Sequence, residues 1–176
     1  MRWGKLTAAI ILSLLLFQST VYGAPPSALD IYNQLLPLQP GENINIAHDL
    51  LGPPHEIGER EGELLPHYWQ RTTKTTNVNV PAEIIMVVIL RNNSIIDSST
   101  YIEVFEQAVP AHQRYLELKE GFHNTLRAPF GEGEYSITWA VGNFRLKLGL
   151  DYLDVNSTSE QSRTIVIVSF FSGKRE

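Results

Sequence analysis

The chain has 176 residues, a formal net charge of −5 at pH 7 and no cysteine. Without cysteine it forms no disulfide, carries no thiol nucleophile or Cys-ligated metal, and offers no cysteine for lipid attachment. The excess of acidic residues argues against partners such as nucleic acid or an anionic lipid surface.

Residues 1–23 have the layout of a secretory signal peptide. A basic start with Arg2 and Lys5 precedes an apolar run over residues 6–17, and the chain then offers a cleavage site after Gly23. An uncleaved anchor is the alternative, although this run is shorter than the roughly 20 residues that cross a bilayer. We therefore expect an exported, periplasmic or extracellular protein of bacterial type, with about 153 residues after cleavage.

Two short helices are predicted at the start of the remaining chain. Ser27 and Asp30 form a capping box for a helix that ends before Pro37. The stretch GENINIAHDLLGPP, residues 41–54, predicts a second helix, and Gly52 suits the left-handed position that follows a helix.

An antiparallel meander is predicted next. Its segments are a long loop at 53–66, a strand at His67–Gln70, a turn region at 72–81, a strand at Ile84–Leu90, a tight turn at Arg91–Asn93 and a strand at Ser94–Ser98.

The second half repeats this order. Thr100 and Glu103 form a capping box for a predicted helix, and Pro110 either kinks this helix or begins another that continues toward Gly121. The segments that follow are strands at Tyr135–Trp139 and Phe144–Tyr152, a polar turn at 154–162 and a strand at Thr164–Phe171.

Helices followed by strands, twice, predict an α+β fold of short helices packed on a meandering antiparallel sheet. Two tandem helix–helix–three-strand repeats would explain the order, as a first half at 24–99 and a second half at 100–176 within one continuous domain. An ungapped overlay at a shift of 76 residues is weak support for duplication, since it aligns Pro53 with Pro129, Glu56 with Glu132 and Tyr68 with Phe144.

The pattern Gly41-x-Asn43-x-x-x-Ala47-x-x-x-Leu51-Gly52-x-Pro54 resembles a signature of the small outer-membrane-assembly lipoproteins. The same architecture occurs twice in tandem in the β-lactamase-inhibitor proteins. The resemblance covers residues 41–98, and residues 100–172 only by element order. It implies a helical layer on an antiparallel sheet, no catalytic residue and a role in binding other proteins. The missing lipidated cysteine and Ala128-Pro129 in place of Gly-x-Pro are departures, so no functional residue is carried over.

Motifs for catalysis, metals or cofactors are not found. The histidines at 48, 55, 67, 112 and 123 lack the spacing of a zinc site, and His48 is predicted to lie on a solvated helix surface. The glutamates between Glu56 and Glu63 are predicted to lie in a solvent-exposed loop, and those between Glu103 and Glu120 on the solvent-exposed face of a helix. We therefore expect no enzyme and no cofactor.

Two aromatic residues are candidates for partner binding. Tyr68 and Trp69 are neighbours on a strand, so they point to opposite faces of the sheet and one of them could be open to a partner. Trp139 is predicted to be core because it alternates with apolar residues. The leading hypothesis is a non-catalytic exported domain that binds a protein or an envelope component.

Two alternatives stay open for function. One is a module that binds a small ligand or lipid on the open face of the sheet, and the other is a secreted hydrolase whose site assembles only in three dimensions. The strands Ile84–Leu90 and Thr164–Phe171 are apolar on both faces, which predicts central strands beneath two layers or a homodimer contact.

Overall fold

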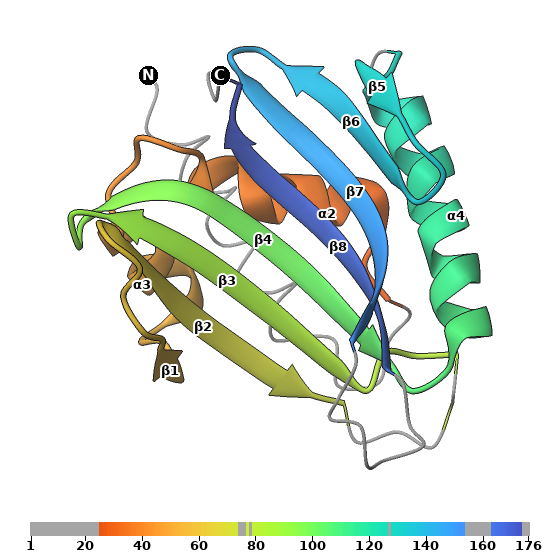
Figure 1. The fold of residues 1–176 in the computed structure, drawn as a ribbon, viewed down its shortest axis with the longest axis horizontal. Coiled ribbons are helices and arrows are strands. Elements are labelled where there is room, and N and C mark those ends of the chain that lie inside the picture. The colour runs from red at the N-terminus through yellow and green to blue at the C-terminus, as the bar shows by residue number, and fades with distance from the viewer. Residues whose placement is uncertain (1–24, 74–76, 78, 127, 154–162, 174–176) are drawn as a thin grey trace, which may run out of the picture.

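The computed structural model describes residues 25–73, 77, 79–126, 128–153 and 163–173. Within these residues, one antiparallel sheet of eight strands lies against a layer of helices (Figure 1). The predicted α+β class, with helices on a meandering antiparallel sheet, is therefore confirmed. The predicted signal peptide and the polar turn at 154–162 lie outside the described residues.

Each half of the chain places its helices before its strands. The first half contains α2 (Ala28–Leu35), the 3-10 helix η1 (Leu36–Leu38), α3 (Asn45–Leu51), β1 (Glu56–Ile57), β2 (Leu64–Thr72), β3 (Glu83–Arg91) and β4 (Ile95–Phe105). The second half contains α4 (Ala108–Thr125), β5 (Gly131–Glu132), β6 (Ser136–Val141), β7 (Phe144–Leu153) and β8 (Arg163–Ser172). The predicted order is correct, but each half has four described strands instead of three, and the second half has one described helix.

The two halves join through their last strands. The strand order is β1-β2-β3-β4-β8-β7-β6-β5, so β4 and β8 pair at the centre of the sheet, with Tyr101 opposite Val168. The two-residue strands β1 and β5 lie at the outer edges, where short strands limit pairing with other chains. Two residues show no measurable period, so no sequence pattern predicts these strands.

The helices cover one face of the sheet and form a single core with it. The alternating residues of the long strands supply one side of this core, including Trp69, Trp139 and Phe170, all fully buried. The other side is an apolar face of each helix, with Ile31 and Leu35 from α2 and, from α4, Ala111, Tyr115, Leu118 and Phe122. Burial of such alternating faces is the main force that holds the two layers together.

The helix termini follow the predicted capping. The Ser27 hydroxyl accepts the Asp30 N–H at 3.2 Å, and the Asp30 carboxylate accepts the Ser27 N–H at 2.9 Å, which confirms the capping box of α2. Gly52 follows α3 with φ of 78° and ψ of −168°, a region that is almost restricted to glycine. The predicted tight turn between β3 and β4 is also confirmed, because Asn92 and Asn93 both have positive φ.

The helix predicted from Thr100 is wrong. Residues 95–105 form the continuous strand β4, and α4 begins only at Ala108 with Pro110 in its first turn. The β-branched side chains of this segment favour a strand, and the Glu103 carboxylate bonds inside the core instead of capping a helix. The predicted boundary between residues 99 and 100 therefore falls within β4.

Two smaller predictions also need correction. The predicted loop at 53–66 contains β1 and the first residues of β2. The overlay at a shift of 76 residues aligns Glu56 in β1 with Glu132 in β5, but it then places Tyr68 of β2 against Phe144 of β7. The connection from β1 to β2 is longer than that from β5 to β6, so an ungapped overlay loses the correspondence there.

Among the described helices, none has both the length and the apolar character that a membrane crossing needs.

Candidate functional site

The second face of the sheet carries no helix among the described residues. The pairing register places a set of apolar side chains together on this face, which we call the apolar stripe: Ile85, Val87, Ile89, Ile102, Val104, Ile165, Ile167 and Phe171. The stripe crosses β3, β4 and β8, the three central strands, which face the viewer in Figure 1 with α2 behind them. Most of these side chains are half-buried, whereas Val104 and Ile165 are buried.

The stripe explains why two strands are apolar on both faces. β3 and β8 are central strands, as one alternative predicted, but the described helices cover only one of their two faces. One set of alternating residues packs in the core, and the other set forms the stripe. Ser98, Thr100 and Ser169 share this face and separate Phe171 from the other apolar side chains, and the Thr100 hydroxyl donates to the Ser169 hydroxyl at 3.1 Å. The remaining apolar side chains still need an explanation besides core packing, because grouped apolar side chains on a protein surface can mark an interaction site.

Charged residues border the stripe on β7. The register places Arg145, Lys147 and Asp151 on the same face as the stripe. The Arg145 guanidinium lies over the Phe130 ring, 4.3 Å from the ring centroid. Lys147 is exposed, and no ion pair joins it to another described residue. This border is therefore locally cationic on a chain whose net charge is negative.

Gly149 produces a hollow between these charged residues. The hollow has a volume of about 240 Å³ and is lined by Tyr135, Lys147, Gly149, Asp151, Ile167 and Ser169. A Cβ placed on Gly149 would lie 3.9 Å from its nearest heavy atom, the Tyr135 carbonyl oxygen. The hollow therefore exists because this position of β7 lacks a side chain.

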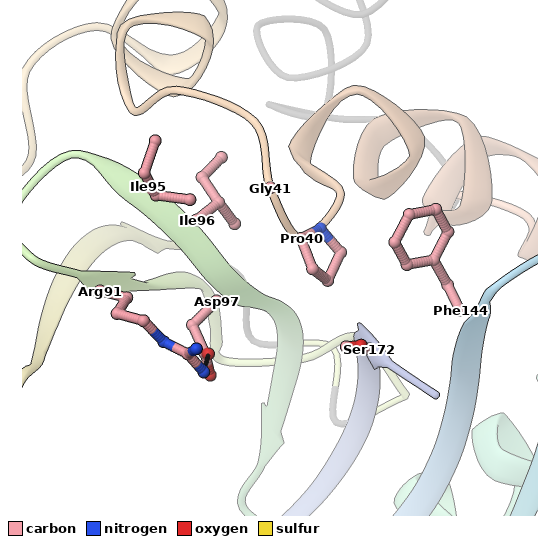
Figure 2. Close-up of a pocket in the computed structure, with 8 residues that line it drawn as sticks. All are labelled: Pro40, Gly41, Arg91, Ile95, Ile96, Asp97, Phe144 and Ser172. Atoms are coloured by element: carbon pink, nitrogen blue, oxygen red, sulfur yellow. Dashed lines mark hydrogen bonds and ion pairs between the residues drawn. The ribbon is translucent and has the colours of Figure 1, made fainter. Parts of the chain in front are cut away.

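A second cavity lies at the ends of the strands. It has a volume of about 400 Å³ and is lined mainly by Pro40, Ile95, Ile96 and Phe144, with the ion pair of Arg91 and Asp97 on one side (Figure 2). Because guanidinium and carboxylate neutralise each other there, the cavity offers apolar walls and little net charge.

The two predicted partner-binding aromatics have different environments. Trp69 is fully buried, and its indole N–H donates to the Gly52 carbonyl at 3.0 Å, so it is a core residue that fixes the exit of α3. Tyr68 is half-buried on the open face, opposite Val87 of the stripe. Partner binding therefore stays a prediction for Tyr68 alone.

Two histidines come together beside Trp69. The His48 and His67 rings stack with centroids 6.0 Å apart, and each ring lies 6.2 Å from the Trp69 ring. Burial, and to a lesser extent the nearby His48, lowers the pKa of His67. The prediction that His48 lies on a solvated helix surface is therefore wrong, because its ring packs against the rings of His67 and Trp69 on β2.

A buried ion pair joins β4 to α4. Arg114 donates to the Glu103 carboxylate through Nε at 2.8 Å and through Nη2 at 2.9 Å, and it also donates to the Pro26 carbonyl at 2.5 Å. The Tyr101 hydroxyl donates to the same carboxylate at 3.0 Å, and burial, followed by the charge of Glu103, raises the pKa of Tyr101. Glu103 was assigned to a wet helix face by its spacing, and that prediction is wrong because it is fully buried.

The buried ion pair lines neither of the two cavities described above, and no group of three or more metal-ligating side chains occurs among the described residues. Comparison with protein-family models, curated proteins and solved structures finds no match.

Sequence reasoning missed most of this site. The alternation within each strand predicted which residues share a face, but not that β4 and β8 are neighbours. One signal was available for the hollow, since Gly149 interrupts an otherwise regular alternation in β7 and an isolated strand glycine marks a close approach.

Proposed function

We propose that this chain is an exported, non-catalytic domain that binds a protein partner on the open face of its sheet. The observation that carries the proposal is the apolar stripe over three central strands without a described helix above it. Tyr68 at one border and the cations of β7 at the other give this face the mixture of aromatic, apolar and charged groups that is enriched at interfaces.

The fold supports the same proposal through the family it resembles. The support is the element order alone, since each half places helices before an antiparallel meander, whereas each half has four described strands and not the three of the predicted repeat. We therefore extend the proposal to membership of that superfamily, whose domains act by binding other proteins.

A matched pair of valine substitutions tests the proposal. Val87 lies in the stripe, whereas Val109 is 68% exposed on α4, which packs on the opposite face. Wild type, Val87→Glu and Val109→Glu are immobilised and exposed to periplasmic or secreted extract, after far-UV circular dichroism has verified their folds. A partner should be retained by wild type and Val109→Glu and weakened at least tenfold by Val87→Glu, since a buried charge without a partner is costly. Equal retention by all three proteins contradicts the proposal, as does the absence of any specific partner.

A second candidate function is a small-ligand module, and the cavity at the strand ends favours it. Its volume of about 400 Å³ falls within the range of about 300–1,000 Å³ that is usual for ligand pockets. Its apolar walls and neutralised ion pair suit an uncharged amphiphile. Octanol should then raise the melting temperature of wild type and of Val87→Glu, but not of Ile95→Trp, which narrows the cavity.

A further inference from the structure

The hollow at Gly149 has the size of a side chain. Its volume of about 240 Å³ lies below the usual range of about 300–1,000 Å³ for small-molecule pockets. It opens on the same face as the apolar stripe, and Ile167 belongs both to the stripe and to the wall of the hollow. A large apolar side chain that enters it would therefore continue the contact that a partner makes with the stripe.

Nothing in the local backbone requires glycine at this position. Gly149 is not among the glycines with positive φ, and the pairing of β7 with β6 and with β8 shows no register shift there. A strand glycine weakens its strand, and its usual reasons are a bulge or the close approach of another group. The regular register leaves the close approach as the explanation.

The charge at the rim indicates what accompanies that side chain. Asp151 lines the hollow on one side of Gly149, and on the other side lie Lys147, which also lines the hollow, and Arg145, which precedes Lys147 on the same face of β7. Neither Lys147 nor Arg145 forms an ion pair within the described part of the chain, although the whole chain is acidic. A carboxylate of the partner on the Lys147 side of the inserted side chain, away from Asp151, would meet both cations.

We infer that the hollow at Gly149 receives a large apolar side chain of a protein partner, flanked by an acidic residue of that partner that pairs with Lys147 and Arg145. This inference rests on the proposed function and adds to it the chemistry of the segment that is recognised. An interface hot spot usually has this form: one side chain enters a pocket, and the contacts around it contribute little binding energy.

A displayed library of random peptides tests the inference on the full chain. Peptides are selected on immobilised wild type and are then measured as synthetic peptides by titration calorimetry. The selected sequences should combine a large apolar residue with a neighbouring Asp or Glu. Gly149→Val places a side chain in the hollow, with its Cβ 3.9 Å from the nearest heavy atom, and should weaken them at least tenfold, as should Lys147→Glu, while Gly131→Val on the edge strand β5 leaves binding unchanged.

The outcomes separate the inference from the proposed function. Peptides that lose affinity for Val87→Glu but bind Gly149→Val and Lys147→Glu normally would overturn the inference and leave the proposed face in place. Peptides that bind Val87→Glu as well as wild type would overturn both. Failure to enrich any sequence, or enrichment of sequences without an acidic residue, also rejects the inference.

Discussion

Replacing Arg114 with Met should destabilise the fold strongly, because it leaves a buried carboxylate without its counter-ion. Glu103 is fully buried and Arg114 is 7% exposed, and the guanidinium supplies two hydrogen bonds to the carboxylate and one to Pro26. Breaking such a pair from one side costs about 3–5 kcal/mol. This is a large part of the roughly 5–15 kcal/mol by which a domain is stable, and it corresponds to a fall in melting temperature of about 6–20 °C.

Urea unfolding, followed by the fluorescence of the buried Trp69 and Trp139, measures this loss. The double variant Glu103→Met with Arg114→Met removes both charges, so it should recover most of the stability that Arg114→Met loses. Glu117→Ala is the control, because its carboxylate is 66% exposed and lies 3.5 Å from Arg114, so it should cost less than about 1 kcal/mol. If the double variant is as unstable as Arg114→Met, the loss comes from packing and the electrostatic argument fails.

Three further outcomes are expected. Because the pKa of His67 is lowered below its ordinary 6.5, the unfolded state binds more protons, so the unfolding free energy should fall as pH drops below about 6.5. Urea midpoints across this range should show a shallower fall for His67→Gln, and an identical fall would exclude His67 as the cause. Gly52→Ala should cost about 1–3 kcal/mol by urea titration, since its φ of 78° with ψ of −168° strains any residue with a Cβ. Asn92→Val should cost about 1–2 kcal/mol in the same assay, because φ is 52° there, and a neutral result would show that the turn has another conformation.

Local sequence patterns predicted the helices and strands well where one face of the element is buried and the other is exposed to solvent. The alternation in β7 and the capping box of Ser27 are examples, because each depends on neighbours within a few residues. The segment from Thr100 to Phe105 failed for the opposite reason. Thr100 and Glu103 match a helix cap although the β-branched residues favour a strand, and pairing with β3 on one side and with β8, more than sixty residues away in sequence, on the other makes this segment a strand.

The candidate site was beyond a local reading for the same reason. Its stripe comes from β3, β4 and β8, so its continuity depends on the strand order and not on any one segment. The buried ion pair was also hidden, because Glu103 lies on a strand that was predicted as a helix, and Arg114 lies on the helix that follows it. Tyr68 and Trp69 were correctly placed on opposite faces, but which face is open follows from where the helices pack.

The central position of β8 has a consequence for how the chain acquires its structure. Residues 163–172 form β8, which pairs with β4 of the first half and with β7 of the second half. Before β8 has joined the sheet, the chain has one sheet of four strands and another of three, and β4 and β7 are exposed edge strands. These edge strands have unpaired backbone N–H and C=O groups, which can pair with strands of other copies of the chain. The sheet therefore loses these exposed edges only when β8, the last strand in the chain, is inserted. A chain truncated before residue 163 should aggregate instead of folding as a smaller stable domain.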